Sequence, residues 1–231
     1  MILESDVKLD FSDVLLRPKR STLVSRKEFN LKRKLKTKWS DKEFEFVPII
    51  AANMATGTFA MAKQFLRNDM LVAIHKFHTK EQWFEQKKDV LKHCIYTIGM
   101  DDGEYNQFKE VRKRLHADGK VSKEDLMLCI DIANGYTKRF SDFVNKIRQE
   151  NMSTIIIAGN VCTPEMVQEL VLAGADFVKV GIGPGSACYD QNENWGWLPA
   201  AERGDRVFRC GSWFGCRDYF GRRHANSWGC R

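Results

Sequence analysis

The stretch "DFVKVGIGPGSAC", residues 176–188, combines three features that bear on the fold. Its first part, 176–183, is an apolar run typical of a buried strand, and it leads directly into a glycine-rich loop that ends at Cys188. The glycines permit tight turns and a close approach of the backbone to a ligand. A strand that ends in such a loop is typical of the ligand-binding edge of a parallel sheet.

Five similar apolar runs precede this stretch, and each is followed by a polar segment with helical character. Strands without strict polar–apolar alternation, each followed by an amphipathic helix, indicate a parallel sheet covered by helices. Six β/α repeats in a row predict either a barrel or a doubly wound sheet. The expected strands are 47–54, 70–76, 94–99, 126–135, 153–161 and 176–183, and the expected helices are 60–68, 79–93, 101–119, 139–151 and 163–175.

Polar or glycine residues recur where the expected strands end, which favours the barrel. A (β/α)8 barrel builds its active site at that edge. A doubly wound sheet also binds ligands there, but no GxGxxG motif follows the first strand. We therefore predict an α/β fold, a (β/α)8 TIM-type barrel that is incomplete, because six of the eight units are recognisable. The residues at the edge are Asn53, His75, Lys76, Asp131, Asn134, Asn160 and the loop from Gly183 to Cys188.

The composition is that of an ordinary soluble globular protein. The chain has 231 residues, of which 43% are hydrophobic and 29% charged. No apolar run approaches the roughly 18 residues that a transmembrane helix needs, and the first ten residues contain no apolar signal core. Seven cysteines, an odd number without a CxxC pair, favour a reducing compartment. We expect a cytoplasmic protein with no membrane partner.

The net charge of +7 arises largely from the basic segment 17–42. Basic clusters can bind nucleic acid or phosphorylated ligands, or can form a solvated surface. No RNA- or DNA-binding motif accompanies this cluster, so we expect no nucleic-acid partner, although a salt-dependent affinity for RNA stays open as an alternative.

Four groups of side chains are candidates for chemistry, each with a simpler structural alternative. Cys188 is a candidate nucleophile if its pKa is lowered, or a buried inert thiol. Asp131 belongs to a polar constellation at the catalytic edge, or caps the next helix. Lys76 pairs with a phosphate or carboxylate, or is part of a basic loop. Asn160 donates from its carboxamide, or forms a turn.

Several motifs, taken together and in order, resemble the IMP dehydrogenase/GMP reductase family. The resemblance covers residues 1–188 and is most specific at the glycine loop with the "IAGNV" segment before it. The segments "RPKRSTLVSR" and "DIANGY" are similar to the reductase branch, and no regulatory domain is inserted after the second expected strand. The matching strings are "KLDFSDVLLRPKRSTLVSR", "VPIIAANM", "TGTFAMA", "HK", "CIDIANGY", "IIIAGNV" and "GADFVKVGIGPGSAC".

This resemblance implies a homotetrameric barrel that performs the NADPH-dependent reductive deamination of GMP to IMP, with release of ammonia. Cys188 would attack C2 of the purine and form a covalent thioimidate, which then accepts a hydride. The resemblance also implies a potassium ion held by backbone carbonyls of Gly183, Gly185 and Cys188, an arrangement that suits a hard cation. Ser186 would bind the substrate. The implied NADPH contacts are Ser25 and Arg26 (from a neighbouring subunit), Lys76, Asp131, Ile132, Ala133, Ile182 and Gly183.

The sequence departs from the family pattern in two places. Ala55 stands where the family has an acid, in a loop that is one residue shorter. After Cys188, the residues Tyr189, Asp190 and Gln191 replace the catalytic threonine and an arginine of the potassium loop. Four of the six tryptophans and three of the seven cysteines also lie after Cys188.

A shifted reading frame accounts for the second departure. When "WGWLPAAE" (195–202) is back-translated and read one base forward, it gives Gly-Val-Gly-Tyr-Pro-Gln-Leu, the family's continuation. The same shift converts "DYFGRR" (218–223) into Ile-Ile-Ser-Asp-Gly-Gly, the family's seventh-strand signature. We therefore predict a barrel domain at 1–188 and a frameshifted tail at 189–231. A genuinely divergent C-terminus is the alternative.

The chain as written is then expected to be inactive. It would lack the phosphate loops that follow the last two barrel strands, and Cys188 would lack an acid to protonate the leaving ammonia. Unpaired parallel edges would also favour aggregation. Two other functions stay open: an IMP dehydrogenase without its regulatory domain, and a non-catalytic fragment that associates with intact homologues.

Overall fold

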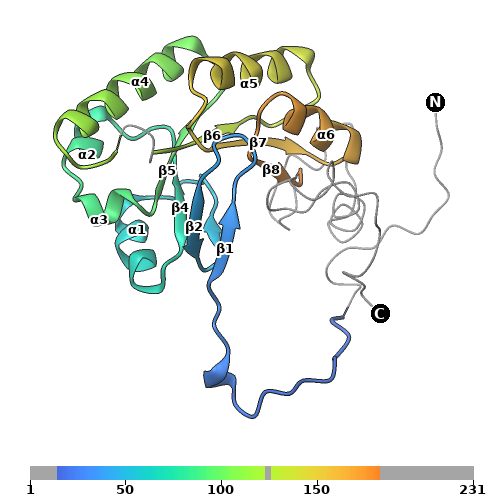
Figure 1. Ribbon diagram of the computed structural model, residues 1–231. Coiled ribbons are helices and arrows are strands. Elements are labelled where there is room, and N and C mark those ends of the chain that lie inside the picture. Colours follow the sequence, from blue (N-terminus) through green and yellow to red (C-terminus); the bar gives the residue numbers. More distant parts are fainter. Residues whose placement is uncertain (1–14, 123–125, 183–231) are drawn as a thin grey trace.

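The computed structural model describes residues 15–122 and 126–182. Within these ranges the strands form a two-stranded antiparallel hairpin and a six-stranded parallel sheet (Figure 1). The hairpin consists of β1 (Arg33–Lys36) and β2 (Glu43–Phe46). The parallel strands are β3 (Ile50–Ala51), β4 (Leu71–Ile74), β5 (Cys94–Ile98), β6 (Met127–Asp131), β7 (Ile156–Val161) and β8 (Phe177–Val180).

The order of the parallel strands confirms the predicted barrel architecture. The six strands lie side by side in chain order, β3 to β8, and every neighbouring pair is parallel. In a doubly wound sheet the strands would not lie in chain order, because the order in which they are added reverses at an internal switch point. In Figure 1 the helices form an arc around the outside of the curled sheet. The described residues thus form five successive β/α units and a sixth parallel strand of an incomplete barrel.

The helices follow the expected segments, with one difference. The segment 79–93 forms two short helices rather than one, because Lys87 has an extended backbone conformation and starts a new helix. Thr163 occupies the expected N-cap position, although its side chain makes no capping hydrogen bond. The helices are α1 (Phe59–Phe65), α2 (Lys80–Phe84), α3 (Lys88–Leu91), α4 (Asp102–Ala117), α5 (Lys138–Glu150) and α6 (Pro164–Leu172), with short 3-10 turns η2 (Arg26–Glu28) and η3 (Leu66–Asn68).

The sheet has one apolar core on each face. The larger core lies between the sheet and the helices and includes Ile74, Leu128 and Phe108, which are at most 1% exposed. The smaller core lies on the inner face, where alternate strand residues such as Ile95 and Cys129 meet Phe46 of the hairpin. Successive side chains of each strand point to opposite faces of the sheet, so neighbouring residues of one strand belong to different cores.

The hairpin β1–β2 was not predicted as a structural element, because its sequence is rich in charge. Its residues Leu35, Phe44 and Phe46 pack against the inner face of the sheet near the strands' N-terminal ends. The candidate site lies at the opposite, C-terminal ends of the strands. Residues 15–32 precede the hairpin as an exposed arm that extends away from the sheet in Figure 1. In the described residues no helix has the length and apolar character needed to span a membrane.

Candidate active site

The polar residues that the sequence places after successive strands do gather at one edge of the sheet. All six strands run parallel, so their C-terminal ends meet at the same edge. Asn53 follows β3, His75 and Lys76 follow β4, Asp131 ends β6 and Asn160 lies within β7. Asn53, His75, Lys76, Asp131 and Asn160 therefore lie at one edge of the sheet, whereas Gly183 to Cys188 lie outside the described residues. The catalytic role of this edge stays a prediction.

Two of these side chains, Asn53 and Asp131, form a hydrogen-bonded cluster with Lys179, and we call the three residues the inner triad. The Asn53 Nδ2 atom donates to Asp131 Oδ2 at 2.8 Å, and Lys179 Nζ donates to Asn53 Oδ1 at 2.9 Å and to Asp131 Oδ1. Lys179 and Asp131 are 25% and 29% exposed in their side chains. Asp131 thus belongs to a polar constellation and does not cap α5, whose N-cap is Thr137.

Lys179 was missed as a candidate at the sequence level. It is the only charged residue in the apolar run 177–183. It lies two residues after Phe177, which packs on the inner face of the sheet, so the alternation of a strand places Lys179 on the same face. A single lysine on the inner face of an otherwise apolar strand is a usable signal, because a buried charge requires a partner. Its partner could not be identified without the strand register, since Asp131 lies 48 positions away.

Lys76 is held by an ion pair at the same edge. Its Nζ lies 3.3 Å from Glu104 Oε1, and Glu104 also accepts a hydrogen bond from the backbone N–H of Gly99. Glu104 lies in the first turn of α4, where a carboxylate is favoured by the helix dipole. The Lys76 side chain is 44% exposed, so a phosphate can approach it and compete with Glu104.

Two histidines stack beside Lys76. The rings of His75 and His78 have centroids 4.0 Å apart, and His78 packs on Phe59 at 4.8 Å. Burial lowers the pKa of His75, and His78 lowers it further. His75 Nδ1 accepts a hydrogen bond from the backbone N–H of Phe77 at 3.3 Å, which fits a neutral ring.

The segment after β6 is a tight turn that packs against β7. The Asn134 Oδ1 atom accepts from the backbone N–H of Tyr136 at 3.0 Å, a hydrogen bond by which asparagine stabilises a turn. A Cβ atom at Gly135 would lie 2.6 Å from the Asn160 carbonyl oxygen, which explains the glycine. The Asn160 Oδ1 atom is buried and has no hydrogen-bond partner among the described residues. It is the kind of acceptor that a ligand donor satisfies.

The remaining expected cofactor contacts differ in how the structure places them. Ile132 exchanges backbone hydrogen bonds with β7, and Ala133 beside it is exposed. Ile182 is only 4% exposed, so its side chain faces the protein. Ser25 lies in the exposed arm and makes no hydrogen bond to the inner triad among the described residues. Arg26 lies in η2, whereas Gly183, Gly185, Ser186 and Cys188 lie outside the described residues.

The cysteines that the structure does describe are not suited to nucleophilic chemistry. Cys94, Cys129 and Cys162 are buried, and none of the three forms a disulfide in the described residues. Burial raises the pKa of Cys94 to about 12 and the pKa of Cys129 to about 11. A thiol with such a pKa is almost entirely protonated at neutral pH and is a poor nucleophile.

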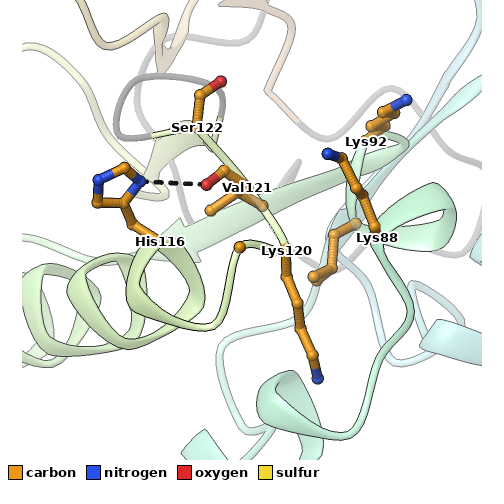
Figure 2. A pocket seen from close by; sticks show the side chains of 8 residues that line it. Lys88, Lys92, His116, Lys120, Val121 and Ser122 are labelled. Carbon is orange, nitrogen blue, oxygen red and sulfur yellow. Dashed lines mark hydrogen bonds between the residues drawn. The ribbon is translucent and has the colours of Figure 1, made fainter.

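A cavity of about 240 Å³ lies away from this edge, between α3 and the end of α4 (Figure 2). Lys88, Lys92, His116 and Lys120 line it. Their polar ends diverge in Figure 2: His116 Nδ1 lies 3.3 Å from the Val121 carbonyl oxygen, and Lys120 Nζ donates to the Phe84 carbonyl. The Lys120 ammonium is therefore engaged by a carbonyl at the C-terminal end of α2, where a positive charge is stabilised by the helix dipole.

Taken together, the curled parallel sheet and the polar cluster at its C-terminal edge define a protein of the TIM-barrel class. Residues 8–194 match the family described as "IMP dehydrogenase / GMP reductase domain". The chain belongs to this family.

Curated relatives that match are named GMP reductase. The protein from Enterobacter sp. is 48% identical over 193 residues, and that from Shewanella halifaxensis is 46% identical over 193 residues; each match covers 81% of this chain and 54% of the relative. GMP reductase 2 of Bos taurus is 46% identical over 190 residues, or 80% of this chain and 53% of the relative. The chain therefore spans about half the length of the curated relatives it matches.

A solved structure confirms the fold independently. The inosine 5′-monophosphate dehydrogenase of Legionella pneumophila superposes with a TM-score of 0.72 at 26% identity, over 88% of this chain and 59% of that chain. The expected barrel architecture and family membership are both confirmed by these comparisons.

Proposed function

We propose that this chain derives from a GMP reductase, which reduces GMP to IMP with NADPH and releases ammonia, and that residues 15–182 build the cofactor side of its active site. The observation that carries the proposal is the inner triad, placed at the catalytic edge of a chain that is 46–48% identical to proteins named GMP reductase. A charged, hydrogen-bonded cluster at this edge is what a nucleotide site requires.

The described residues fit a dinucleotide cofactor. Asp131 offers carboxylate oxygens to ribose hydroxyl groups, and the half-exposed Lys76 offers a cation to a phosphate. The cofactor, when bound, supplies a hydride. Asn160 presents a buried acceptor beside this position, and Ile132 and Ala133 connect Asp131 to the turn at Gly135.

Cys188 is the proposed nucleophile, in the loop that follows β8. Its thiolate adds to C2 of GMP, the amino group takes up a proton from a general acid of the intact enzyme, and the carbon–nitrogen bond breaks to release ammonia, which leaves a thioimidate with C2 bonded to sulfur. After C2 accepts the hydride, the carbon–sulfur bond breaks and IMP is released. We place substrate binding at Ser186 and a potassium ion at the carbonyls of Gly183, Gly185 and Cys188.

The exposed arm is assigned to a neighbouring subunit in this proposal. Ser25 and Arg26 would reach the cofactor of another copy in a homotetramer, which agrees with the exposed position of Ser25 and its lack of contact with the inner triad in its own chain. The basic character of this arm suits the cofactor's phosphates. The intact enzyme would act in the cytoplasm.

The tail from residue 189 is proposed to be a frameshift product, and the 231-residue chain is proposed not to turn over GMP. The support is the pair of family motifs at 195–202 and 218–223 that one shift of frame restores. An active barrel of this class uses the loops after its last two strands to bind phosphate.

The test compares two proteins: the 231-residue chain and a version whose frame is shifted after codon 188. NADPH consumption is measured with GMP, and ammonia and IMP are quantified. The shifted version is expected to be active and its Cys188→Ala variant inactive, whereas the 231-residue chain is expected to show no turnover. Turnover by the 231-residue chain would refute its inactivity, and a folded but inactive shifted version would refute the assigned reaction.

The same two proteins distinguish the alternatives. Reduction of NAD with IMP as substrate would identify an IMP dehydrogenase. Co-purification of the inactive 231-residue chain with an intact homologue would identify a fragment that acts by association.

A further inference from the structure

Asp131, Gly159 and Lys179 form a straight row across three neighbouring strands. In the sheet register Asp131 of β6 pairs with Gly159 of β7, and Gly159 pairs with Lys179 of β8. Neighbouring strands lie about 4.8 Å apart, so Asp131 and Lys179 are separated by two such spacings. Only a long side chain that runs across β7 can join them.

Gly159 leaves the space that this crossing needs. A Cβ atom there would lie 2.6 Å from Lys179 Cβ and 2.6 Å from the Lys179 carbonyl oxygen. Both distances are shorter than real contacts of a Cβ atom, and the second involves backbone that does not swing aside. The glycine is therefore a steric requirement of the row rather than a turn residue.

The ammonium at the end of this crossing orients both partners. Lys179 Nζ donates to Asp131 Oδ1 and to Asn53 Oδ1, while Asn53 Nδ2 donates to Asp131 Oδ2 at 2.8 Å. Each carboxylate oxygen thus has a different donor, which fixes the rotation of the carboxylate plane. The triad also ties β8 to the loop after β3, at opposite sides of the six-stranded sheet.

We propose that Lys179 is a positioning residue of the active site: it holds the Asp131 carboxylate and the Asn53 carboxamide at the catalytic edge, and Gly159 is the residue that lets it cross β7. The inference rests on the proposed function in one respect, namely that the ligand bound by Asp131 is NADPH. It assigns to Lys179 and Gly159 roles that act through Asp131 and not by contact with the reacting atoms. Charge-assisted hydrogen bonds of this kind supply geometric precision to a site.

The experiment uses the 231-residue chain and four variants. Lys179→Met removes the charge but keeps a long unbranched side chain, Lys179→Arg keeps the charge, and Gly159→Ala obstructs the crossing. Lys109→Met is the matched control, because Lys109 pairs with Glu150 at 3.5 Å between α4 and α5, away from the edge. Hydrogen–deuterium exchange is followed in peptides that cover 50–57 and 129–136, and NADPH binding is followed by fluorescence titration.

Lys179→Met is expected to speed exchange by about fivefold or more in both peptides, since both lose their shared anchor. NADPH affinity should fall about tenfold, the cost of releasing a charge-assisted hydrogen bond. Lys179→Arg keeps the positive charge and its hydrogen-bond donors, and should restore both properties to within a factor of about three. Gly159→Ala should reproduce the Lys179→Met exchange pattern, and Lys109→Met should change neither property.

Unchanged exchange in Lys179→Met would overturn the inference, as would a failure of Lys179→Arg to restore it. A loss of exchange protection throughout the chain, α5 included, would also overturn it, because Lys179 would then be a general structural residue. If the unmodified chain does not bind NADPH, the proposed function fails for this chain, while the exchange pattern still decides the role of Lys179.

Discussion

The Arg148 guanidinium and the Asp176 carboxylate form a buried ion pair, with Nη2 and Oδ2 separated by 2.7 Å and side chains 4% and 0% exposed. Asp176 Oδ1 also accepts from the backbone N–H groups of Trp39 at 3.0 Å and Ser40 at 3.2 Å. The Nε and Nη1 atoms of Arg148 donate to backbone carbonyls, that of Gly174 at 2.8 Å among them. One pair therefore joins α5, the turn before β8 and the hairpin.

We predict that removing one member of this pair is severely destabilising. Asp176→Ala should lower the free energy of unfolding by about 3–5 kcal/mol, because it leaves a buried guanidinium without its counter-charge. Urea unfolding followed by circular dichroism measures this change. As a control, Lys138→Ala breaks the exposed pair with Asp142 at 2.9 Å and should cost less than about 1 kcal/mol. Equal losses in the two variants would contradict the role given to the buried pair.

A second prediction concerns the contribution of the hairpin to the inner core, against which its apolar side chains pack. Phe46 is 5% exposed and stacks on Phe44 with ring centroids 5.1 Å apart. Phe46→Ala should lower the unfolding free energy by about 3–5 kcal/mol through lost burial and a cavity. Phe29→Ala, in the arm and 48% exposed, is the control and should have little effect. A stable Phe46→Ala protein with unchanged near-ultraviolet circular dichroism would show that the hairpin is not part of the core.

The sequence predicted the six parallel strands because each is a short apolar run followed by a helix. The hairpin was missed because "RKLK" and "EFEF" are short and charged. In "EFEF" the alternation is nevertheless present: Phe44 and Phe46 point inward while the glutamates are exposed. A segment of four residues with two glutamates is too short and too charged for this alternation to predict a strand. The hairpin became apparent only from the packing of its phenylalanines against the sheet.

The candidate site was predictable only in part, for a similar reason. Asp131 and Lys76 were found because polar residues after apolar strands meet at one edge of a parallel sheet. Lys179 and Glu104 were missed because their importance lies in pairings across the fold: Lys179 with Asp131, and Glu104 with Lys76. Such pairings depend on register and on the start of α4, which no local pattern specifies.

A third prediction follows from the stacked histidines. The pKa of His75 is lowered from its usual 6.5 by burial and by His78. The unfolded chain therefore binds more protons than the folded protein near that pH, and stability should rise with pH through this region. On acidification, stability should fall as the pH passes below about 6.5, the unfolded value, and level off below the folded pKa.

The ring resonances of His75 in a proton NMR titration test this assignment directly. The measured pKa should lie below 6.5 and should move upward in His78→Gln, which removes the neighbouring charge. His75→Gln should flatten the pH dependence of the thermal midpoint between about pH 5 and pH 7. A titration at or above the usual value would contradict the neutral state assigned to this partly buried ring.

A fourth prediction concerns the described thiols. Burial raises the pKa of Cys94 to about 12 and that of Cys129 to about 11, so iodoacetamide at neutral pH should leave both unlabelled in the folded protein. Both should react after unfolding in urea, which serves as the control for reagent access. Labelled positions are identified by peptide mass spectrometry. Rapid labelling of either cysteine in the native state would show that its strand opens readily.

The last prediction distinguishes the contribution of the Lys76 ammonium to cofactor binding from that of the Glu104 carboxylate with which it pairs. The Lys76 Nζ atom lies 3.3 Å from Glu104 Oε1, so in the free protein its charge is already balanced. Lys76→Met should weaken NADPH binding about tenfold, through loss of a charge-assisted contact to phosphate. Glu104→Gln should preserve the binding or strengthen it, because it removes the competing carboxylate but keeps an oxygen that can accept from the Gly99 N–H. The affinity of the unmodified chain should also fall with salt, and that dependence should weaken in Lys76→Met. If both substitutions reduced the affinity equally, the ion pair itself, rather than the lysine charge offered to a phosphate, would be what the cofactor requires.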